Sequence, residues 1–271
     1  MKIGFIGVGN MASAIIKGII THGFIAGNQI IAYDHHPEKL TNMVNEYQIH
    51  LAQNEDEVIE LADYVLFAVK PNVLLPLIEK HQKQLVANHP VILSIAAGTT
   101  LAQLEHALGE NQQLPVIRIM PNVNAMVGLG AAAICGNTHA TKEQLDLVLD
   151  MFNAVGKAWF VAEKDFSNFT AIAGSSPAYA YLFIDTLARA AVKHGLPKQL
   201  STEIAAQAVL GSAKMILESE ENPWGLIDKV CSPGGTTVAG LLAMEENNFM
   251  TSIIKGIDAT IQKDQEMQNK K

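Results

Sequence analysis

The sequence contains few cysteines, because only Cys135 and Cys231 occur in 271 residues. The two lie far apart and fit neither a zinc-binding pattern nor a disulfide scaffold, so we expect a reducing compartment and no metal site. No uninterrupted apolar run reaches the roughly 20 residues that a membrane helix needs. The Gly-interrupted N-terminus lacks a signal-peptide pattern. These absences predict a cytoplasmic protein.

Basic residues are also scarce. The chain has 19 Lys and Arg against 27 Asp and Glu, which gives a formal net charge of −8, and its basic residues form no cluster. A surface that follows nucleic-acid phosphates is therefore not expected, and small molecules are the expected partners. With 49% hydrophobic and 17% charged residues, the chain can bury a sizeable core in one or two domains.

The first part of the chain, residues 1–162, alternates short apolar runs with helical patterns. The runs are KIGFIG, QIIAY, YVLFAV, PVILSIA, LPVIRIM, AAAIC and AWFVA, and the helical patterns cover residues 10–21, 37–46, 55–61, 73–85, 100–108 and 141–155. Such alternation predicts βαβ units and a mainly parallel sheet. Thr141 and Gln144 form a capping-box pattern at the start of the last of these helices.

The remaining residues, 163–271, show no strand pattern. Their apolar residues recur at three- and four-residue spacing, with Pro at segment starts and Gly at segment ends, which predicts an all-helical second domain. Several of these helices are rich in Ala and Gly on more than one face, so we expect a homodimer or a higher assembly of dimers. The polar tail, QKDQEMQNKK, is expected to fray.

A glycine-rich turn stands between the first expected strand and the first expected helix. Gly7-Val8-Gly9-Asn10-Met11-Ala12 has the G-x-G-x-x-A form in which glycines allow a tight turn and bring pyrophosphate close to a helix N-terminus. Asp34 ends the second expected strand, roughly 20 residues further on, where an acid can bind the adenosine ribose. The first domain is therefore expected to be a Rossmann domain that binds a nicotinamide dinucleotide.

The choice between NADH and NADPH stays open. Asp34 disfavours the 2′-phosphate of NADPH, but His35, His36 and Lys39 follow it and can neutralise that phosphate, and Asn54 can donate hydrogen bonds.

Further residues are expected to line the cofactor site because the carboxyl ends of parallel strands share one edge of the sheet. Those at the ends of the expected strands YVLFAV and PVILSIA are Ala68, Val69, Lys70, Ala96, Ala97 and Gly98. Asn122 follows the expected strand LPVIRIM and is the candidate for a polar contact to nicotinamide or substrate.

A second glycine-rich turn interrupts the helical half. The stretch SPGGTT, from Ser232 to Thr237, directly precedes an expected helix and offers two glycines, hydroxyl groups and backbone N–H groups at a helix start. Such a turn can hold an anion.

These motifs, together with FAVKP at 67–71, SIAAG at 94–98, RIMPN at 118–122 and GSSPAY at 174–179, resemble those of the Δ1-pyrroline-5-carboxylate reductase family over almost the whole chain. The resemblance implies a Rossmann domain, a helical domain that dimerises, and an active site completed across the dimer. It also implies the final step of proline biosynthesis, in which NADPH or NADH reduces a cyclic imine that bears one carboxylate.

The resemblance implies roles for the second turn. The backbone N–H groups around Gly234, Gly235 and Thr236 are expected to bind the substrate carboxylate, and the hydroxyl of Thr237 faces the ring nitrogen. Ser232 is expected to lie against the substrate. Glu220 matches an acid near the ring nitrogen, although it can equally be a solvated acid at a helix end.

Two motifs depart from the family pattern. Val123 and Asn124 stand where the family usually has Thr-Pro, and Ser176 replaces a usual Gly. They leave two alternatives open, namely an imine reductase for a different cyclic imine and a dinucleotide-binding regulatory protein without catalysis. A β-hydroxy acid dehydrogenase is disfavoured, because Ala180 and Phe183 occupy the positions where that group has its Lys and Asn.

Overall fold

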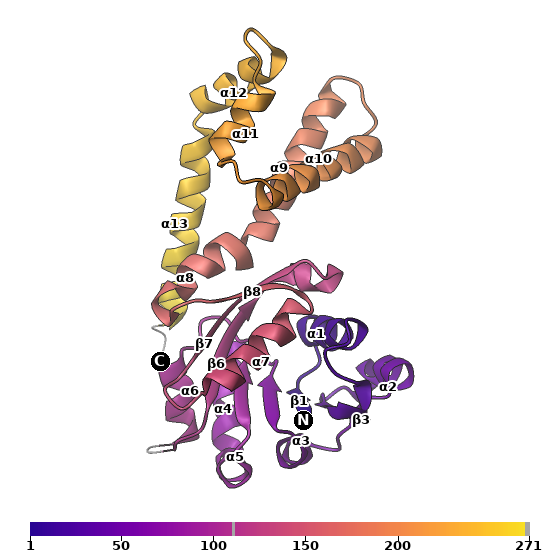
Figure 1. Cartoon of the computed structure of the whole chain (residues 1–271), viewed down its shortest axis with the longest axis vertical. Coiled ribbons are helices and arrows are strands. Elements are labelled where there is room, and N and C mark those ends of the chain that lie inside the picture. Colours follow the sequence, from indigo (N-terminus) through magenta and orange to yellow (C-terminus); the bar gives the residue numbers. More distant parts are fainter. Residues whose placement is uncertain (110–111, 269–271) are drawn as a thin grey trace. The chain divides into compact units, whose positions relative to one another are not determined.

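The computed structural model describes residues 1–109 and 112–268, apart from the side chain of Lys39. Within it the chain forms two compact units. One comprises Met1–Ser175 together with Thr260–Lys271, and the other comprises Ser176–Ala259. Helices and strands make up the first unit, whereas the second is built of helices (Figure 1).

An eight-stranded sheet organises the first unit. Its strand order is β3-β2-β1-β4-β5-β6-β7-β8, and all neighbours are parallel except β6 and β7. The strands are β1 Ile3–Ile6, β2 Ile30–Tyr33, β3 His50–Leu51, β4 Tyr64–Phe67, β5 Val91–Ser94, β6 Val116–Pro121, β7 Gly130–Gly136 and β8 Gly156–Phe160. The predicted mainly parallel, Rossmann-like sheet is confirmed, and β3 is a strand that the prediction lacks.

Helices connect these strands. In chain order they are α1 Asn10–Thr21, α2 Thr41–Tyr47, α3 Glu55–Leu61, α4 Pro71–Lys80, α5 Gln82–Asn88, α6 Leu101–Leu108, α7 Lys142–Asn153 and α8 Phe166–Phe169. Shorter 3-10 turns cover Gly27–Gln29, Pro37–Lys39, Val123–Val127 and Glu163–Asp165, and a π-helical turn covers Thr170–Gly174.

Most of the predicted helices are confirmed, but two predictions need correction. The single helix expected over 73–85 is two helices that meet at His81, where the backbone leaves the helical region and the buried imidazole contacts Asp56 through Nδ1 at 2.7 Å. The segment 37–46 begins as a 3-10 turn before α2 starts. The capping box of Thr141 and Gln144 is confirmed at α7.

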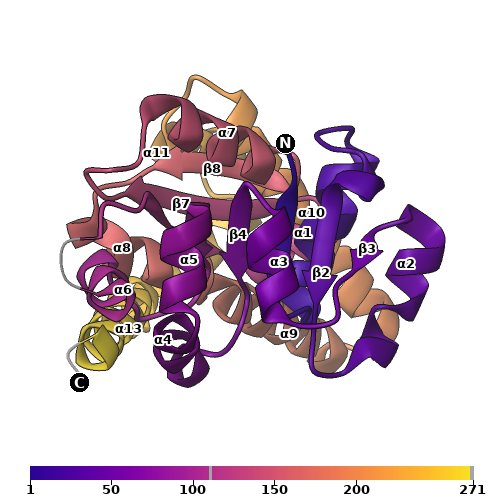
Figure 2. The same cartoon turned by 90° about the horizontal axis from the view of Figure 1, so that it is seen from below.

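The core lies on both faces of the sheet. Phe5 belongs to a cluster with the apolar side of α1 and α7, whereas the next residue, Ile6, belongs to a cluster with α3 to α6. Successive residues of a strand point to opposite faces, so a parallel sheet covered on both sides needs the near-continuous apolar runs seen in the sequence. Figure 2 shows α3 and α5 in front of the strands.

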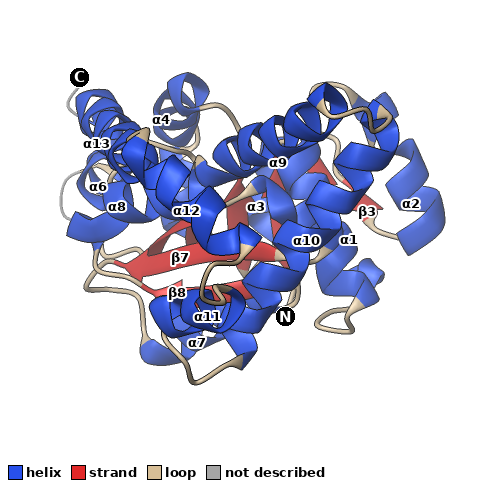
Figure 3. Cartoon of the chain, turned by 90° about the horizontal axis from the view of Figure 1, so that it is seen from above, coloured by secondary structure: helices blue, strands red, loops and turns tan. Residues whose placement is uncertain are grey.

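The second half of the chain forms α9 Ser176–Lys193, α10 Lys198–Glu218, α11 Pro223–Val230, α12 Thr236–Glu246 and α13 Phe249–Gln268. Among the described residues that follow Phe160 there is no strand (Figure 3), which confirms the predicted helical domain. The prediction that the polar tail frays is wrong up to Gln268, because α13 continues to that residue and Asp264 is buried. No described helix combines the length and apolar character needed to cross a membrane.

Candidate functional site

Gly7 turns the chain between β1 and α1. Its φ of +88° lies in the left-handed region, and a Cβ built on it would come within 2.8 Å of the carbonyl oxygen of Ala68. Its N–H donates to the carbonyl of Tyr33 at 2.8 Å. Both the backbone angle and the neighbouring β4 loop therefore require glycine here.

Gly9 is the N-cap residue of α1, and it leaves the helix N-terminus open. A Cβ built on it meets no described atom within 4 Å. Within the described part of the chain, α1 has no side-chain cap and no acidic residue in its first turn. The first N–H groups of α1, at Asn10, Met11 and Ala12, are orphan donors at the positive end of the helix. The loop thus fits a dinucleotide pyrophosphate.

Asp34 ties the end of β2 to this loop. Its Oδ2 accepts a hydrogen bond of 2.8 Å from the N–H of Val8, and its Oδ1 accepts one of 2.9 Å from the N–H of His36. A carboxylate has further lone pairs. Ribose binding by Asp34 stays a prediction, while bracing of the glycine-rich loop is its observed role.

His35 and Asn54 lie at the same end of the sheet. The imidazole of His35 is exposed, with Nδ1 3.3 Å from the Tyr33 hydroxyl and Nε2 3.7 Å from Oε1 of the buried Glu55. Burial, Glu55 and Asp34 raise the pKa of Tyr33, so its hydroxyl stays protonated. Asn54 caps α3 by accepting from the N–H of Glu57 at 2.9 Å. Their contacts with a cofactor stay predictions.

The loops after β4 and β5 share an edge with the glycine-rich loop. In the parallel register Ile6 pairs with Phe67, and Phe67 pairs with Ser94, so the loops that follow these strands leave the sheet together. Their residues are those predicted to line the cofactor site: Ala68, Val69, Lys70, Ala96, Ala97 and Gly98. Lys70 is exposed at the N-cap of α4, and Gly98 has a φ of +72°.

Asn122 is buried and engaged at both ends of its amide. Its Oδ1 accepts from the N–H of Ala131 at 2.9 Å, and its Nδ2 donates to the carbonyl of Ala173 at 3.0 Å. It therefore joins β6 to β7 and to the π-helical turn. The observed role of Asn122 is therefore structural. Its contact to nicotinamide or substrate stays a prediction.

The SPGGTT turn, from Ser232 to Thr237, lies in the second compact unit. Gly234 has a φ of +68°, and the N–H of Gly235 donates to the carbonyl of Ser232 at 3.0 Å. A Cβ built on Gly235 would lie 2.5 Å from the Ser232 hydroxyl oxygen. Glycine is thus needed at 234 for the backbone angle and at 235 for the space that Ser232 occupies.

This turn opens onto the start of α12. As far as the described residues show, α12 has no side-chain cap and no acidic residue in its first turn, and Thr236 and Thr237 are exposed. The first-turn N–H groups of Thr236, Thr237 and Val238 are therefore orphan donors. Gly235, which we expected among the carboxylate donors, already donates within the turn, whereas the N–H of Val238, which the sequence motif did not indicate, is a further orphan donor.

Glu220 is exposed in the loop before α11, whereas the turn follows α11. A helix of this length spans about 12 Å. The neighbouring Glu221 pairs with Lys229 of α11. A role for Glu220 near the ring nitrogen stays a prediction.

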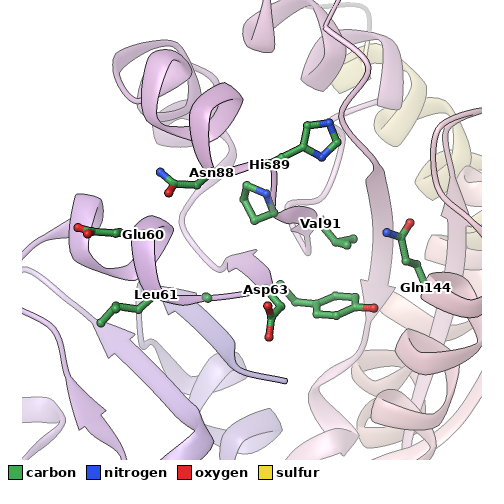
Figure 4. A pocket seen from close by; sticks show the side chains of 10 residues that line it. Glu60, Leu61, Asp63, Asn88, His89, Val91 and Gln144 are labelled. Atoms are coloured by element: carbon green, nitrogen blue, oxygen red, sulfur yellow. The ribbon is translucent and has the colours of Figure 1, made fainter.

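A polar pocket of about 330 Å³ lies at the other edge of the sheet (Figure 4). It is lined by the residues that lead into β4 and β5, among them Asp63 and His89, and by Gln144. Because these are the amino ends of the strands, the pocket is remote from the loops that fit a dinucleotide, and we do not assign it to the cofactor.

Comparison with known proteins places this geometry in a family. The pyrroline-5-carboxylate reductase of Escherichia coli (strain K12) is 39% identical over 266 residues, which cover 98% of each chain. The chain belongs to the pyrroline-5-carboxylate reductase family. Residues 163–267 match the family model described as pyrroline-5-carboxylate reductase dimerisation, and residues 2–98 match that described as NADP oxidoreductase, coenzyme F420-dependent.

Solved structures of pyrroline-5-carboxylate reductases agree with the fold. That from Coxiella burnetii superposes with a TM-score of 0.93 at 32% identity and 99% coverage of each chain. That from Plasmodium falciparum, with NADP bound, has a TM-score of 0.88 at 30% identity, covering 99% of this chain and 98% of its own. The resemblance inferred from the sequence motifs is confirmed.

The dimerisation match starts at residue 163, whereas the compact units divide after Ser175. The difference concerns α8 and the π-helical turn. Phe166 and Phe169 of α8 pack with Ala133 of β7, so this segment lies with the sheet.

Proposed function

We propose that this chain catalyses the reduction of Δ1-pyrroline-5-carboxylate to L-proline with NADPH or NADH, the final step of proline biosynthesis. The observation that carries the proposal is the uncapped start of α12 behind Gly234 and Gly235, in a chain of the pyrroline-5-carboxylate reductase family. The substrate carries one carboxylate, and this helix start suits one small anion.

At the cofactor end, the N-terminus of α1 would hold the pyrophosphate, because Gly9 leaves room for close approach. The loops after β4 and β5 would hold the nicotinamide half, and the ends of β2 and β3 the adenosine half. When bound, the reduced nicotinamide supplies a hydride to the imine carbon. The binding of NADP by the Plasmodium falciparum relative supports this assignment.

At the substrate end, the N–H groups of Thr236, Thr237 and Val238 would bind the carboxylate, with Ser232 beside it. Reduction of a C=N bond adds one hydride to carbon and leaves one proton on nitrogen. A ring nitrogen that arrives protonated needs no strong acid, so positioning and electrostatics can supply most of the acceleration. The hydroxyl of Thr237 and the carboxylate of Glu220 are the groups we assign to the nitrogen.

The protein is proposed to act as a homodimer. Apolar side chains of the helical unit are exposed in the single chain, among them Leu182, Leu210, Leu242 and Ile254. Surfaces of this kind mark protein interfaces, and the match to a dimerisation model supports the same reading. The two unpaired cysteines suit the reducing cytoplasm, which is the proposed location.

The test is an absorbance assay of reduced-nicotinamide consumption with pyrroline-5-carboxylate, run in parallel with NADPH and NADH, with proline measured as the product. Formation of proline in step with cofactor oxidation would establish the activity, and the two efficiencies would rank the cofactors. Cofactor oxidation only with larger cyclic imines would favour the alternative imine reductase. Cofactor binding without turnover of any imine would favour the regulatory protein.

A further inference from the structure

The C-terminal end of α13 packs against the first unit. From Thr260 onwards this helix belongs to the same compact unit as the sheet. Its last turns lie beside α6 and α8 in both Figure 1 and Figure 2. Neither the proposed catalysis nor dimerisation accounts for these contacts.

A buried polar triangle fixes this end of the helix to α8. The carboxylate Oδ2 of Asp264 accepts 2.8 Å and 2.6 Å hydrogen bonds from Ser167 Oγ and Gln268 Nε2. Gln268 Nε2 also lies 3.0 Å from Ser167 Oγ. Asp264 is 6% exposed and Ser167 5%. A buried carboxylate is costly without such donors, so the triangle specifies one position for the helix end.

A second link runs from α13 to the start of α6. Gln103 Nε2 donates to the carbonyl of Gln268 at 3.1 Å, while Gln103 Oε1 accepts from the N–H of Thr100 at 2.9 Å. Thr100 and Gln103 form a capping box that begins α6. One amide side chain therefore connects the first turn of α6 to the end of α13.

A third contact reaches the loop between β5 and α6. Gly98 has a φ of +72°, and a Cβ built on it would lie 3.3 Å from the Cβ of Met267. Gly98 belongs to the loop after β5, which is proposed above to hold the nicotinamide half of the cofactor together with the loop after β4. The end of α13 thus lies close to this loop at Met267, and the main-chain carbonyl of Gln268 accepts a hydrogen bond from the helix that follows the loop.

We propose that the C-terminal end of α13 positions the β5–α6 loop for the nicotinamide half of the cofactor, with Asp264 and Gln268 as positioning residues that themselves touch no cofactor atom. This inference rests on the proposed function. A loop that is held in its binding conformation before the ligand arrives loses less entropy on binding. The adenosine half is proposed to bind at the ends of β2 and β3, so its affinity should not depend on these contacts of α13.

The experiment compares two ligands on full-length protein. NADPH contains the nicotinamide, whereas 2′-phospho-ADP-ribose lacks it and keeps the adenosine half and the pyrophosphate. Asp264→Ala and Gln268→Ala are expected to weaken NADPH binding by about three- to tenfold, the equivalent of one ordinary hydrogen bond, and to leave 2′-phospho-ADP-ribose affinity within about twofold of wild type. Asp264→Asn, which keeps an oxygen acceptor, is expected to restore most of the NADPH affinity.

Lys263→Ala is the matched control, because Lys263 is exposed on the same helix turn and pairs with Glu266 of the same helix. It should leave both affinities unchanged. Gln268→Ala covers the case in which Asp264→Ala fails to fold, since it removes one donor to the Asp264 carboxylate while Ser167 still donates to it.

Equal weakening of both ligands would overturn the inference, because it would indicate general destabilisation of the sheet domain. Unchanged NADPH affinity in both alanine variants would overturn it as well. Failure of the wild-type protein to bind NADPH, NADH or 2′-phospho-ADP-ribose would instead overturn the proposed function, and this inference with it.

Discussion

Arg118 of β6 and Glu163 form an ion pair in which Nη1 donates to Oε1 at 3.0 Å. Arg118 is 2% exposed, and its guanidinium carbon lies 4.5 Å from the centre of the Phe166 ring. The same Glu163 oxygen accepts from the N–H of Leu101 at 2.7 Å, at the first residue of α6. One carboxylate therefore joins the sheet, the start of α6 and the segment that leads into α8.

Glu163→Gln is expected to lower the free energy of unfolding by about 2 kcal/mol, less than for a fully buried pair because Glu163 is partly exposed. Urea denaturation would measure it. In an Arg118→Met background the same change should cost markedly less, since no buried cation is left unpaired. An equal loss in both backgrounds would show that the pair itself contributes nothing.

Substitution of Gly7 is expected to lower stability, whereas substitution of Gly9 is expected to weaken cofactor binding. Gly7→Ala forces a side chain into a positive φ and against Ala68, and should lower the free energy of unfolding by about 1–3 kcal/mol. Gly9→Ala has room in the structure and should fold with normal stability, but its methyl group would occupy the space proposed for pyrophosphate. We expect NADPH binding by Gly9→Ala, measured by fluorescence titration, to weaken by about tenfold or more. Normal NADPH affinity in Gly9→Ala would argue against this pyrophosphate site.

Thr237 is expected to matter for turnover through its hydroxyl. Thr237→Val should lower kcat by about 10- to 100-fold, while Thr237→Ser should stay close to wild type. NADPH affinity should be unchanged in both. Thr202→Val, which alters a half-buried threonine of α10, is the control. Equal activity of the Val and Ser variants would show that the Thr237 hydroxyl has no role in turnover.

Cys135 is expected to make stability fall at alkaline pH. Burial, reinforced by Glu163 and opposed by Arg118, raises the pKa of the Cys135 thiol from 9.0 to about 12. Between these values the unfolded chain has lost the proton and the folded chain retains it, so stability decreases as pH rises through this window. From about pH 8 to about pH 10.5 the full shift corresponds to about 2 kcal/mol. Because the thiol is only partly buried, we expect wild type to lose about half of this, about 1 kcal/mol, more than Cys135→Ala in urea denaturation. Parallel losses in the two proteins would contradict this assignment.

The dimer is expected to depend on the helical unit. Sedimentation should give twice the chain mass of 29.2 kDa for the wild-type protein. Leu210→Asp, which places a charge on an exposed apolar position of α10, should shift the protein towards monomer, because a buried leucine contributes about 1.5–3 kcal/mol at an interface. Leu61→Asp, at an exposed position of α3 in the sheet domain, should not. A monomeric wild-type protein would contradict the proposed homodimer.

Local patterns were enough for much of the fold. The apolar periodicity and the cap at Thr141 predicted α1, α3 and α7 closely, because these signals lie within a few residues of the helix they specify. The same patterns could not show that β6 and β7 run antiparallel, since a short apolar run carries no information about the direction of its neighbour. They also merged α4 and α5, because the break at His81 involves a contact with Asp56, 25 residues away.

The two glycine-rich turns and the family could be inferred from the sequence by itself, because a tight turn before a helix depends on neighbouring residues. Only the tertiary structure decided which polar groups are already engaged. Asp34 binds the backbone of Val8, Asn122 bridges Ala131 and Ala173, and Asp264 is buried against Ser167. The partners in these contacts are separated by 9 to 97 residues along the chain, and packing of the folded sheet and helices brings them together.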